Sequence, residues 1–498
     1  MIGGCQNLEV LASGILSQYP QGTTMSRATL RFLSPSEIER IHETSLRLLA
    51  EVGVAIHSES VSKLLTAAGA HASGDRKRVL IPRDMVESAL SSAPRSVLLA
   101  SRVQGGDIRI PGERLYCANG GEGVYIKDML TGVTSSPTLD SVEKFVSLVE
   151  ALPSIDIAWD MVGAIEQPVE VKGLVELKAA LEFSRKHYEG GAMGAMEAKQ
   201  MVELASILTG GPDELAKRPI FSAIQCPISP LTFDKDLVEA QVELAKVGIP
   251  IVSMSAAVAG LTSPATISGT IAQVNAENLA SLTICQVAKK GAPFVYSSDS
   301  SAGDLRSGSI DYEALESVLL RTAAGEMGRH YQLPVQVGAV SLEESALLLS
   351  RVREGVPYLI LQALVPSDLS SGFGGIDQAA GASYEMMVVD AWVWEAAREF
   401  IRDFDASDSA ISFDTISAAA LDNNFLSKRH TAAHFKKEFS STRNPEAVLS
   451  SRGPPRARGD LLYRAKNEVR RILKDARPVI SKRESEEMQL VIDKARKG

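Results

Sequence analysis

The chain has 498 residues, 45% of them hydrophobic, which is enough to bury a large core. Its formal net charge of −9 argues against nucleic acid or an anionic membrane as partner, since both select basic surfaces. Four widely spaced cysteines without a CxxC pair argue against a disulfide framework or a thiolate zinc site, and no apolar run approaches the roughly 18 residues needed to cross a bilayer. We therefore expect a cytoplasmic protein with one large domain and an appended region.

The first part of the chain is expected to form a disordered or extended tail over residues 1–32 and an α-rich cap over 33–132. The cap begins with Ser34-Pro35-Ser36-Glu37, which combines a capping box with proline at the first helical position. Apolar periodicity then predicts a helix that ends at Gly53, two more over 59–68 and 83–92, and a strand at 79–82. The stretch 114–132 contains two short apolar runs around a glycine turn, which predicts a β-hairpin.

From residue 133 onward, short apolar runs alternate with helical segments. Strands are predicted at 155–162, 187–193, 219–225, 249–254, 293–298, 333–338 and 357–364, with an eighth expected near 409–414. Helices are predicted over 171–185, 198–208, 235–246, 264–290, 311–331 and 342–353. This alternation favours the α/β class and a (β/α)8 TIM-like barrel over 133–440, with a doubly wound open sheet as the alternative.

Three segments follow the last of these predicted strands. The stretch 367–381 is predicted as a glycine-rich loop, and 384–402 as a long helix. Residues 441–498 are predicted to form a C-terminal helical extension.

Polar residues gather at the carboxyl ends of the predicted strands, where parallel barrels carry their chemistry. These residues are Asp160, Glu166, Gln225, Ser253, Ser255, Asp299, Asp304 and Arg306. A simpler interpretation of each one is that it caps the next helix, so the cluster is more informative than any single member. In the polar loop 297–308, Asp299 and Asp304 are our candidates for catalysis and Arg306 is a candidate for substrate binding.

Aromatic faces near carboxylates can bind a cation. Trp159, Tyr296 and Phe373 lie at or beside predicted strand ends, and Glu122 lies in a glycine turn with Gly120, Gly121 and Gly123. On position alone, these four residues are further candidates for substrate binding.

A pair of histidines has a spacing found in metal sites. His430 and His434 are four residues apart on one face of a predicted helix, a spacing that can hold a metal. No third ligand accompanies them, and Lys428, Arg429, Lys436 and Lys437 indicate a solvated surface. No metal site is predicted.

Several stretches of the chain match one family in order and spacing. They are LSPSEIERIHETSLRLLAEVGVAIHSE (33–59), VLIPRDMVESALSSAP (79–94), NGGEGVYIKDMLTG (119–132), TLDSVEKFVSLVEALPSIDIAW (138–159), DLRSG (304–308), GRHYQLPV (328–335) and NFLSKRHTAAHF (424–435). With these stretches, the sequence resembles the trimethylamine–corrinoid methyltransferase family over about 33–471. It resembles most the members without pyrrolysine, which act on quaternary amines such as glycine betaine.

The resemblance implies a (β/α)-barrel enzyme that moves a methyl group from a quaternary or otherwise methylated amine to the cobalt of a corrinoid protein. The corrinoid would be supplied by that partner protein, with no tightly bound cofactor and no metal, and we expect a homo-oligomer. The chain contains no pyrrolysine, and Asn423-Asn424 stand where the family typically has Gly-His, which indicates a divergent member. The alternatives are a barrel enzyme of another reaction class, or a non-catalytic protein that binds a small cation or a corrinoid protein.

Overall fold

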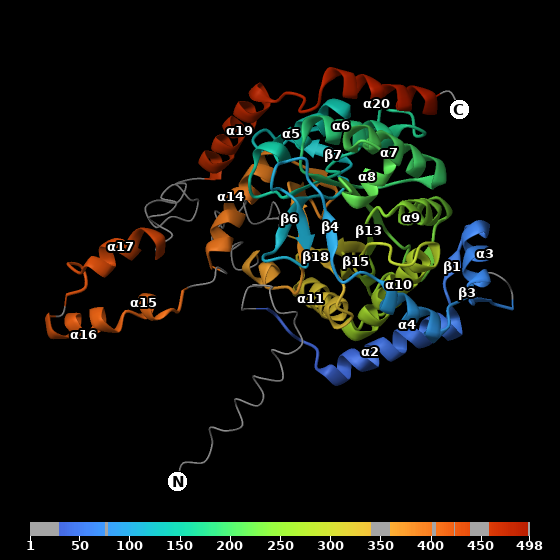
Figure 1. Cartoon of the computed structure of the whole chain (residues 1–498), viewed down its shortest axis with the longest axis horizontal. Helices are drawn as coiled ribbons and strands as arrows, with labels where there is room; N and C mark the ends of the chain where they lie inside the picture. Colours follow the sequence, from blue (N-terminus) through green and yellow to red (C-terminus); the bar gives the residue numbers. More distant parts are fainter. Residues whose placement is uncertain are drawn as a thin grey trace, which may run out of the picture.

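The computed structural model describes residues 29–74, 78–339, 359–400, 405–422, 424–438 and 458–496. At its centre, eight parallel strands close into a barrel (Figure 1). In chain order they are β6 (Tyr116–Asn119), β9 (Ile157–Trp159), β10 (His187–Gly190), β11 (Phe221–Gln225), β13 (Ile251–Ser255), β15 (Phe294–Ser298), β18 (Val335–Ala339) and β19 (Leu369–Phe373). Each strand pairs with the next one in this order, and β19 pairs with β6. The predicted barrel is therefore confirmed, and the open sheet is excluded.

Two barrel strands lie at positions where no barrel strand was predicted from the sequence. β6 was predicted as half of a hairpin, but it pairs with β9 and β19 rather than with β7 (Tyr125–Lys127). The barrel therefore begins before residue 133. β19 lies within the stretch 367–381, which was predicted as a loop because of its glycines and serines.

Two predicted strands are wrong. Residues 359–363 of the predicted strand at 357–364 are helical. The stretch 409–414 contains the end of α15 (Asp408–Ile411) and the start of α16 (Phe413–Asp422). Short apolar runs fit a buried strand and a buried helix equally well, which explains both errors. The predicted helix at 342–353 lies outside the described residues.

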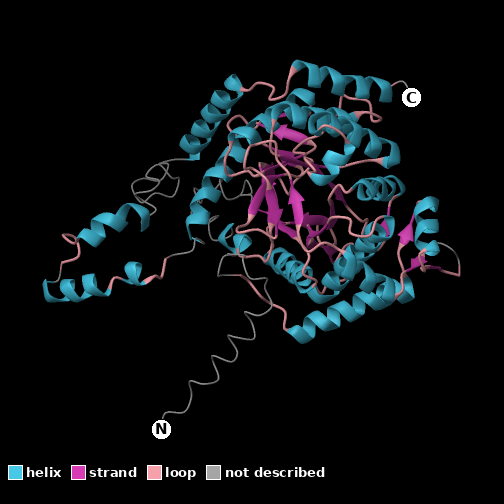
Figure 2. Cartoon of the chain, viewed as in Figure 1, coloured by secondary structure: helices cyan, strands magenta, loops and turns pink. Residues whose placement is uncertain are grey.

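Helices surround the barrel and connect its strands (Figure 2). They are α5 (Leu139–Ala151), α6 (Lys172–Phe183), α7 (Gly194–Thr209), α8 (Pro212–Lys217), α9 (Lys235–Val247), α10 (Ile267–Ala288), α11 (Leu315–His330) and α14 (Tyr384–Phe400). Two small sheets follow the carboxyl ends of barrel strands. One contains β7, β8 (Thr134–Ser135), β20 (Gly375–Ile376) and β21 (Gly381–Ala382), and the other contains β14 (Val258–Ala259), β16 (Ser301–Asp304) and β17 (Ser309–Asp311).

A hairpin closes the amino-terminal end of the barrel. Its strands are β4 (Val97–Leu99) and β5 (Ile108–Ile110), and their apolar side chains form one cluster with the interior of the barrel. The barrel residues in this cluster include Ala118, Ile157, Ile224, Val252, Val295 and Leu369. Because apolar packing fills this end, the described part of the chain leaves the carboxyl ends of the strands as the approach to the interior.

The amino-terminal cap packs on α10. α2 (Pro35–Arg47) begins at the predicted capping box, in which Glu37 Oε2 accepts from the Ser34 hydroxyl at 2.6 Å and from the Ser34 N–H at 2.8 Å. α2 and α4 (Arg83–Ser92) both contact α10, which is buried on all sides over residues 270–286. The remaining elements of the cap are a π-helix (Leu48–Val52), β1 (Ala55–Ile56), α3 (Glu59–Ala67), β2 (His71–Ala72) and β3 (Val79–Leu80), and β1 pairs with β12 (Thr232–Phe233).

A buried ion pair joins the strands at which the barrel closes. Arg329 on α11 donates two hydrogen bonds to the carboxylate of Asp368, at 2.6 and 2.8 Å. The same carboxylate accepts from the Val335 N–H of β18 at 2.8 Å, and the Asp368 carbonyl accepts from the Tyr116 N–H of β6 at 2.9 Å. The side chains of Arg329 and Asp368 are only 14% and 2% exposed.

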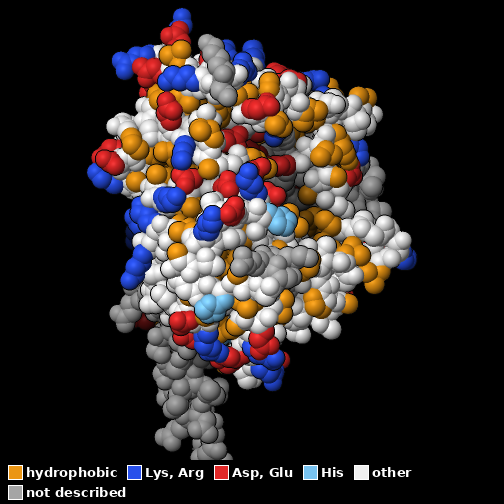
Figure 3. Space-filling model, turned by 90° about the vertical axis from the view of Figure 1, so that its right-hand side faces the viewer, with side chains coloured by type: hydrophobic (Ala, Val, Ile, Leu, Met, Phe, Trp, Pro, Cys, Tyr) orange, Lys and Arg blue, Asp and Glu red, His pale blue; other side chains and the backbone are white. Residues whose placement is uncertain are grey.

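The carboxyl-terminal helices return to the barrel. α19 (Arg458–Asp475) packs on α5 and α14, and α20 (Lys482–Ala495) packs on α6 and α7. Between α14 and α19, the helices α15, α16 and α17 (Arg429–Glu438) form an arm that stands away from the barrel (Figure 1). None of the helices in the described ranges is both long and apolar enough to cross a membrane. On the face seen in Figure 3, acidic and basic side chains are interspersed, as the modest net charge suggests.

Replacing Asp368 with alanine is expected to lower the free energy of unfolding by about 3–5 kcal/mol, because it leaves the Arg329 guanidinium buried without its partner. The change is measured from urea unfolding curves followed by circular dichroism. Glu43→Ala is the control, since it removes an exposed ion pair with Arg83 and should leave the curve unchanged. Equal losses in the two variants would contradict the role given to Asp368.

Candidate functional site

The opening at the carboxyl ends of the eight strands is called the mouth of the barrel. Within the described residues, it is the only approach to the interior that the hairpin does not block. Alternate residues of a strand face opposite sides of the sheet. On β15, Val295 belongs to the interior cluster, so Ser297 and Asp299 also face the interior and Tyr296 faces the surrounding helices. This alternation decides which candidates can reach a ligand.

Asp299 lies in the mouth, half-buried, directly after β15. Its Oδ2 accepts a hydrogen bond from the Tyr312 hydroxyl at 2.8 Å. Burial raises the pKa of Asp299, while the positive charge of Arg321 and the hydrogen bond from Tyr312 act to lower it. The buried Arg321 guanidinium lies 5.3 Å from the centre of the Tyr312 ring. These three residues therefore form one electrostatic unit on the β15 side of the mouth.

Glu189 lies deeper in the interior, where sequence reasoning missed it. Its Oε1 accepts from Gln336 Nε2 at 2.6 Å, and because β10 and β18 stand on opposite sides of the barrel, this bond spans the interior. Ser222 donates to Glu189 Oε2 at 3.3 Å and lies 3.0 Å from His187 Nε2. Burial raises the pKa of Glu189 to about 7 and lowers the pKa of His187 to about 4. A carboxylate within a predicted buried strand was the signal available in the sequence.

Two further residues, Glu122 and Cys226, extend this acidic region from the interior of the barrel to the solvent. Cys226 follows β11 and its side chain is exposed to solvent, although many protein atoms lie around it. Burial and the negative charges of Asp299, Glu122 and Glu189 raise the pKa of Cys226 to about 12. The thiol is therefore protonated at neutral pH. The three carboxyl groups come from three separate barrel strands or the loops after them. The sequence signal for Cys226 was its place after the predicted strand at 219–225.

Trp159 supplies an aromatic face at the mouth. Asn119 at the end of β6 fixes its backbone, since Asn119 Oδ1 accepts from the Trp159 N–H at 2.9 Å and Asn119 Nδ2 donates to its carbonyl at 2.6 Å. The indole packs on Gly120, where any Cβ would stand 2.1 Å from the ring. The half-buried ring also packs against the interior apolar cluster. Only glycine at position 120 allows this close approach.

Tyr296 and Phe373 do not reach the mouth. Tyr296 is fully buried among the helices, where its hydroxyl donates to Asn275 of α10 at 3.2 Å. Phe373 is fully buried against α14, with its ring edge-on to Trp394 at 6.4 Å between centres. Both side chains therefore pack between the barrel and its helices.

Asp304 and Arg306 lie in the exposed turn between β16 and β17. The Asp304 carboxylate accepts from the Arg306 N–H and from the Ser307 hydroxyl, each at 2.9 Å, and these bonds lower its pKa. The side chain of Arg306 is 95% exposed. Asp304 therefore stabilises a turn, which is a common role for aspartate. It does not lie beside Asp299.

Three other polar residues at the strand ends have structural partners, whereas the Gln225 amide and the Ser253 hydroxyl are buried without a hydrogen-bond partner. Asp160 accepts from the Tyr188 hydroxyl at 2.5 Å, and Ser255 donates to Glu277 of α10 at 2.5 Å. Glu166 accepts from the Leu139 N–H at 2.9 Å, so it caps α5, the helix before β9, rather than the next helix as the simpler interpretation expected.

No metal centre is found in the described part of the chain. The rings of His430 and His434 stack 4.2 Å apart on α17, but no group of three potential ligands occurs among these residues. Both histidine side chains are half-buried, and His430 Nε2 is buried without a hydrogen-bond partner.

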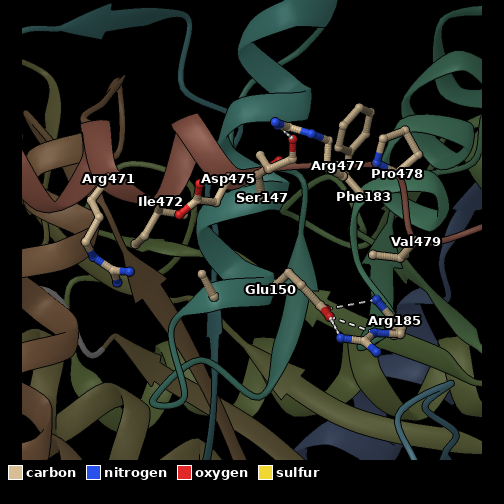
Figure 4. A pocket seen from close by; sticks show the side chains of 12 residues that line it. Ser147, Glu150, Phe183, Arg185, Arg471, Ile472, Asp475, Arg477, Pro478 and Val479 are labelled. Atoms are coloured by element: carbon tan, nitrogen blue, oxygen red, sulfur yellow. Dashed lines mark hydrogen bonds and ion pairs between the residues drawn. The ribbon is translucent and has the colours of Figure 1, made fainter.

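A separate pocket of about 310 Å³ lies where the carboxyl-terminal extension meets the barrel helices (Figure 4). Glu150 and Arg185 form an ion pair at 2.7 Å on one side, and Arg477 and Val479 lie on the other. Because Arg185 stands just before β10 begins, this pocket lies at the end of the barrel opposite the mouth. It shares no residue with the acidic region.

The mouth therefore combines the carboxyl groups of Glu122, Glu189 and Asp299 with the indole of Trp159. Carboxylates and indole faces both attract cations, and the attraction grows where protein excludes water. This arrangement can bind a small positively charged molecule. The opening is wide enough that a side chain within it is exposed to solvent.

Comparison with known proteins identifies the family. The family described as trimethylamine methyltransferase (MTTB) matches residues 6–498. A trimethylamine methyltransferase of Desulfitobacterium hafniense (strain DSM 10664 / DCB-2) is 27% identical over 408 residues, 82% of each chain. A glycine betaine methyltransferase of D. hafniense (strain Y51) is 27% identical over 82% of this chain and 85% of that protein, and a proline betaine:corrinoid methyltransferase of Eubacterium limosum is 27% identical over 88% and 92%. The family and the enzyme class expected from the sequence are thus confirmed: the chain belongs to the trimethylamine methyltransferase (MTTB) family.

Proposed function

We propose that this methyltransferase moves a methyl group from a small quaternary or otherwise methylated amine to the corrinoid of a separate protein. The observation that carries the proposal is the placement of three carboxyl groups around one closed barrel: Glu122 follows β6, Glu189 lies on β10 and Asp299 follows β15. A methylated ammonium ion cannot shed its charge, so it needs negative groups or aromatic faces around it. The relatives named above act on trimethylamine, glycine betaine and proline betaine, which supports an amine substrate.

The residues of the mouth have distinct tasks in this proposal. Asp299 and Glu122 attract the ammonium ion, and Trp159 gives it a π face. When bound, the corrinoid of the partner protein would supply the nucleophile for the methyl carbon, and the electron pair of the C–N bond would return to the amine nitrogen. The protein holds the amine so that one methyl group points out of the barrel. Tyr296, Phe373, Asp304 and Arg306 are not assigned contacts with the amine, because their side chains lie elsewhere.

The rim of the mouth fits a protein partner that brings the corrinoid. Loops after the barrel strands expose apolar side chains around the opening: Val124, Ile165, Val169, Met193, Met196, Ile228, Leu261 and Leu305. Apolar side chains gathered around one opening are typical of a docking surface, and methionine adapts well to a partner. A broad macrocycle presented on this rim would face the interior directly.

A cytoplasmic location and a homo-oligomer belong to the same proposal. Cys117 and Cys285 are buried free thiols, which suits a reducing compartment. The arm exposes Phe413, Leu421 and Leu426, and apolar side chains exposed together usually mark an interface. These features support self-association through the arm.

Asp299→Asn is expected to lower kcat/KM for methyl transfer at least about tenfold. Two unit charges about 5 Å apart attract by roughly 3 kcal/mol at an effective dielectric constant of about 20, and about 1.4 kcal/mol corresponds to tenfold. Transfer is followed through the absorbance change of the corrinoid. Asp304→Asn is the matched control and should keep the wild-type rate. A wild-type rate in Asp299→Asn would remove this residue from the site, whereas substrate binding without any transfer would favour a binding protein.

Met193→Asp is expected to raise KM for the corrinoid protein at least about tenfold and to leave the affinity for the amine unchanged, because a charge on the apolar rim opposes docking. The two affinities are measured separately, by kinetics and by calorimetry. Leu490→Asp on α20 is the control, since Leu490 is equally exposed but lies on the outer helices. The rim assignment fails if both variants behave alike.

The affinity for the amine is expected to rise between pH 6 and pH 8. A carboxyl group with a pKa of about 7 goes from about one tenth to about nine tenths ionised over this interval, so Glu189 attracts the cation more strongly at high pH. Calorimetry across this range gives the profile. Glu189→Gln should flatten it, and an unchanged profile in that variant would rule out Glu189 as its origin.

A further inference from the structure

A chain of hydrogen bonds links the two small sheets at the mouth and ends on Asp299. We propose that Gln378 is a positioning residue, which acts through Tyr312 to hold the carboxylate of Asp299 in place for the substrate. This inference rests on the proposed function, because it concerns the residue that attracts the amine there. Gln378 itself is not assigned a contact with the amine.

Two hydrogen bonds form this chain. The Gln378 amide oxygen accepts from the Tyr312 N–H at 2.6 Å, and the Tyr312 hydroxyl donates to Asp299 Oδ2 at 2.8 Å. Gln378 lies in the turn between β20 and β21, Tyr312 directly follows β17, and Asp299 directly follows β15. The chain therefore connects the sheet of β7, β8, β20 and β21 with the sheet of β14, β16 and β17.

The turn that carries Gln378 has a costly backbone conformation. Asp377, Gln378 and Ala379 have φ angles of 52°, 58° and 65°, all in the left-handed region. Among the described residues, no other two consecutive non-glycine residues share this conformation. It costs free energy for residues with a side chain, and it persists only where the surrounding structure enforces it. Such conformations are concentrated at functional sites, which indicates a role for the residue at the centre of this turn.

Contacts with β7 and the residue before it enforce the turn. The Asp377 carboxylate accepts from the Tyr125 hydroxyl of β7. The Val124 N–H donates to the Ala380 carbonyl at 2.8 Å, and the Ala380 N–H donates to the Asp377 carbonyl at 3.1 Å. The backbone is thereby fixed on both sides of Gln378, and its side chain is held toward Tyr312.

Tyr312 depends on this contact because its neighbours in the chain are bonded elsewhere. Asp311 Oδ1 accepts from the Ala314 N–H at 3.0 Å, and the Asp311 carbonyl accepts from the Ser317 hydroxyl of α11 at 2.7 Å. The Tyr312 N–H is bonded to Gln378 instead. Loss of this acceptor would leave a partly buried N–H without its partner, and a shift of Tyr312 would relieve that cost.

A shift of Tyr312 would be transmitted to Asp299. The whole side chain separates the Tyr312 N–H from its hydroxyl, so the contact with Gln378 sets the position of the hydroxyl and not its acidity. The hydroxyl in turn fixes Asp299 Oδ2. A charged group that binds or orients a substrate must be held within a fraction of an ångström of its productive position. Gln378 therefore influences the amine from a distance.

Gln378→Leu removes the acceptor at little change in size and is expected to lower kcat/KM for methyl transfer at least about fivefold, because Asp299 loses its position. The KM for the corrinoid protein is expected to stay at the wild-type value. The assays use the full chain, a reduced corrinoid protein, and tetramethylammonium or glycine betaine as methyl donor. Gln332→Leu is the matched control, since Gln332 is an exposed glutamine with a φ angle of 57° that precedes β18 at the opposite end of the barrel. Wild-type kinetics in Gln378→Leu would overturn the inference.

A double variant tests whether Gln378 acts through Tyr312. Tyr312→Phe removes the hydroxyl and is expected to lower kcat/KM at least about fivefold as well. Adding Gln378→Leu to Tyr312→Phe is expected to cause no further loss, because the two residues act on Asp299 in series. Losses that multiply to about 25-fold, as for two independent sites, would contradict this order of action.

Hydrogen exchange tests the contact apart from the activity. Peptides that contain the Tyr312 N–H are expected to exchange faster in Gln378→Leu, and at the wild-type rate in Gln378→Glu, whose carboxylate is also an acceptor. Equal exchange in Gln378→Leu and wild type counts against the inference. A wild type that transfers a methyl group from neither donor removes the proposed function and the inference with it. An active wild type that Gln378→Leu matches removes the inference alone.

Discussion

The barrel depends on the buried ion pair between Arg329 and Asp368, because this pair holds together the strands at which the sheet closes. Asp368 receives two hydrogen bonds from Arg329 and one from the backbone of β18, and its carbonyl receives one from β6. The last and first barrel strands are thereby fixed to each other. All strand ends of a closed parallel barrel meet at one opening, so carboxyl groups distant in sequence become neighbours. An open sheet would not bring Glu122, Glu189 and Asp299 together.

Most of the fold could be read from the sequence because its helices are long and periodic. The capping box at Ser34 and the helices around the central strands follow from local chemistry. The two strands that close the barrel could not be read in this way. β6 is four residues beside a glycine turn, and β19 contains serines and a glycine, which have little strand preference. Their strand conformation comes from pairing with each other, and that is a property of the closed barrel.

The candidate site was predictable where strand alternation applies. Asp299 lies at a strand end and faces inward, whereas Tyr296 is three residues earlier and must face outward, which the sequence could have revealed. Phe373 is different. It is four residues after the inward-facing Leu369, but an irregular pairing between Ser370 and Phe373 turns it toward α14. Such a bulge has no sequence signal here. Glu189 was missed because its role depends on Gln336, a residue on the far side of the barrel.

The charges at the mouth also constrain how the proposed reaction could be fast. The positive charge of the amine disappears as the methyl group leaves, so carboxylates stabilise the bound substrate more than the transition state. A fully ionised site would bind tightly and react slowly. Burial raises the pKa of both Glu189 and Asp299, which withholds part of the negative charge at neutral pH. The remaining negative charge is then sufficient to bind a cation. It does not strongly oppose the loss of the positive charge of that cation during methyl transfer. The gain in rate must come chiefly from holding the methyl group toward the corrinoid.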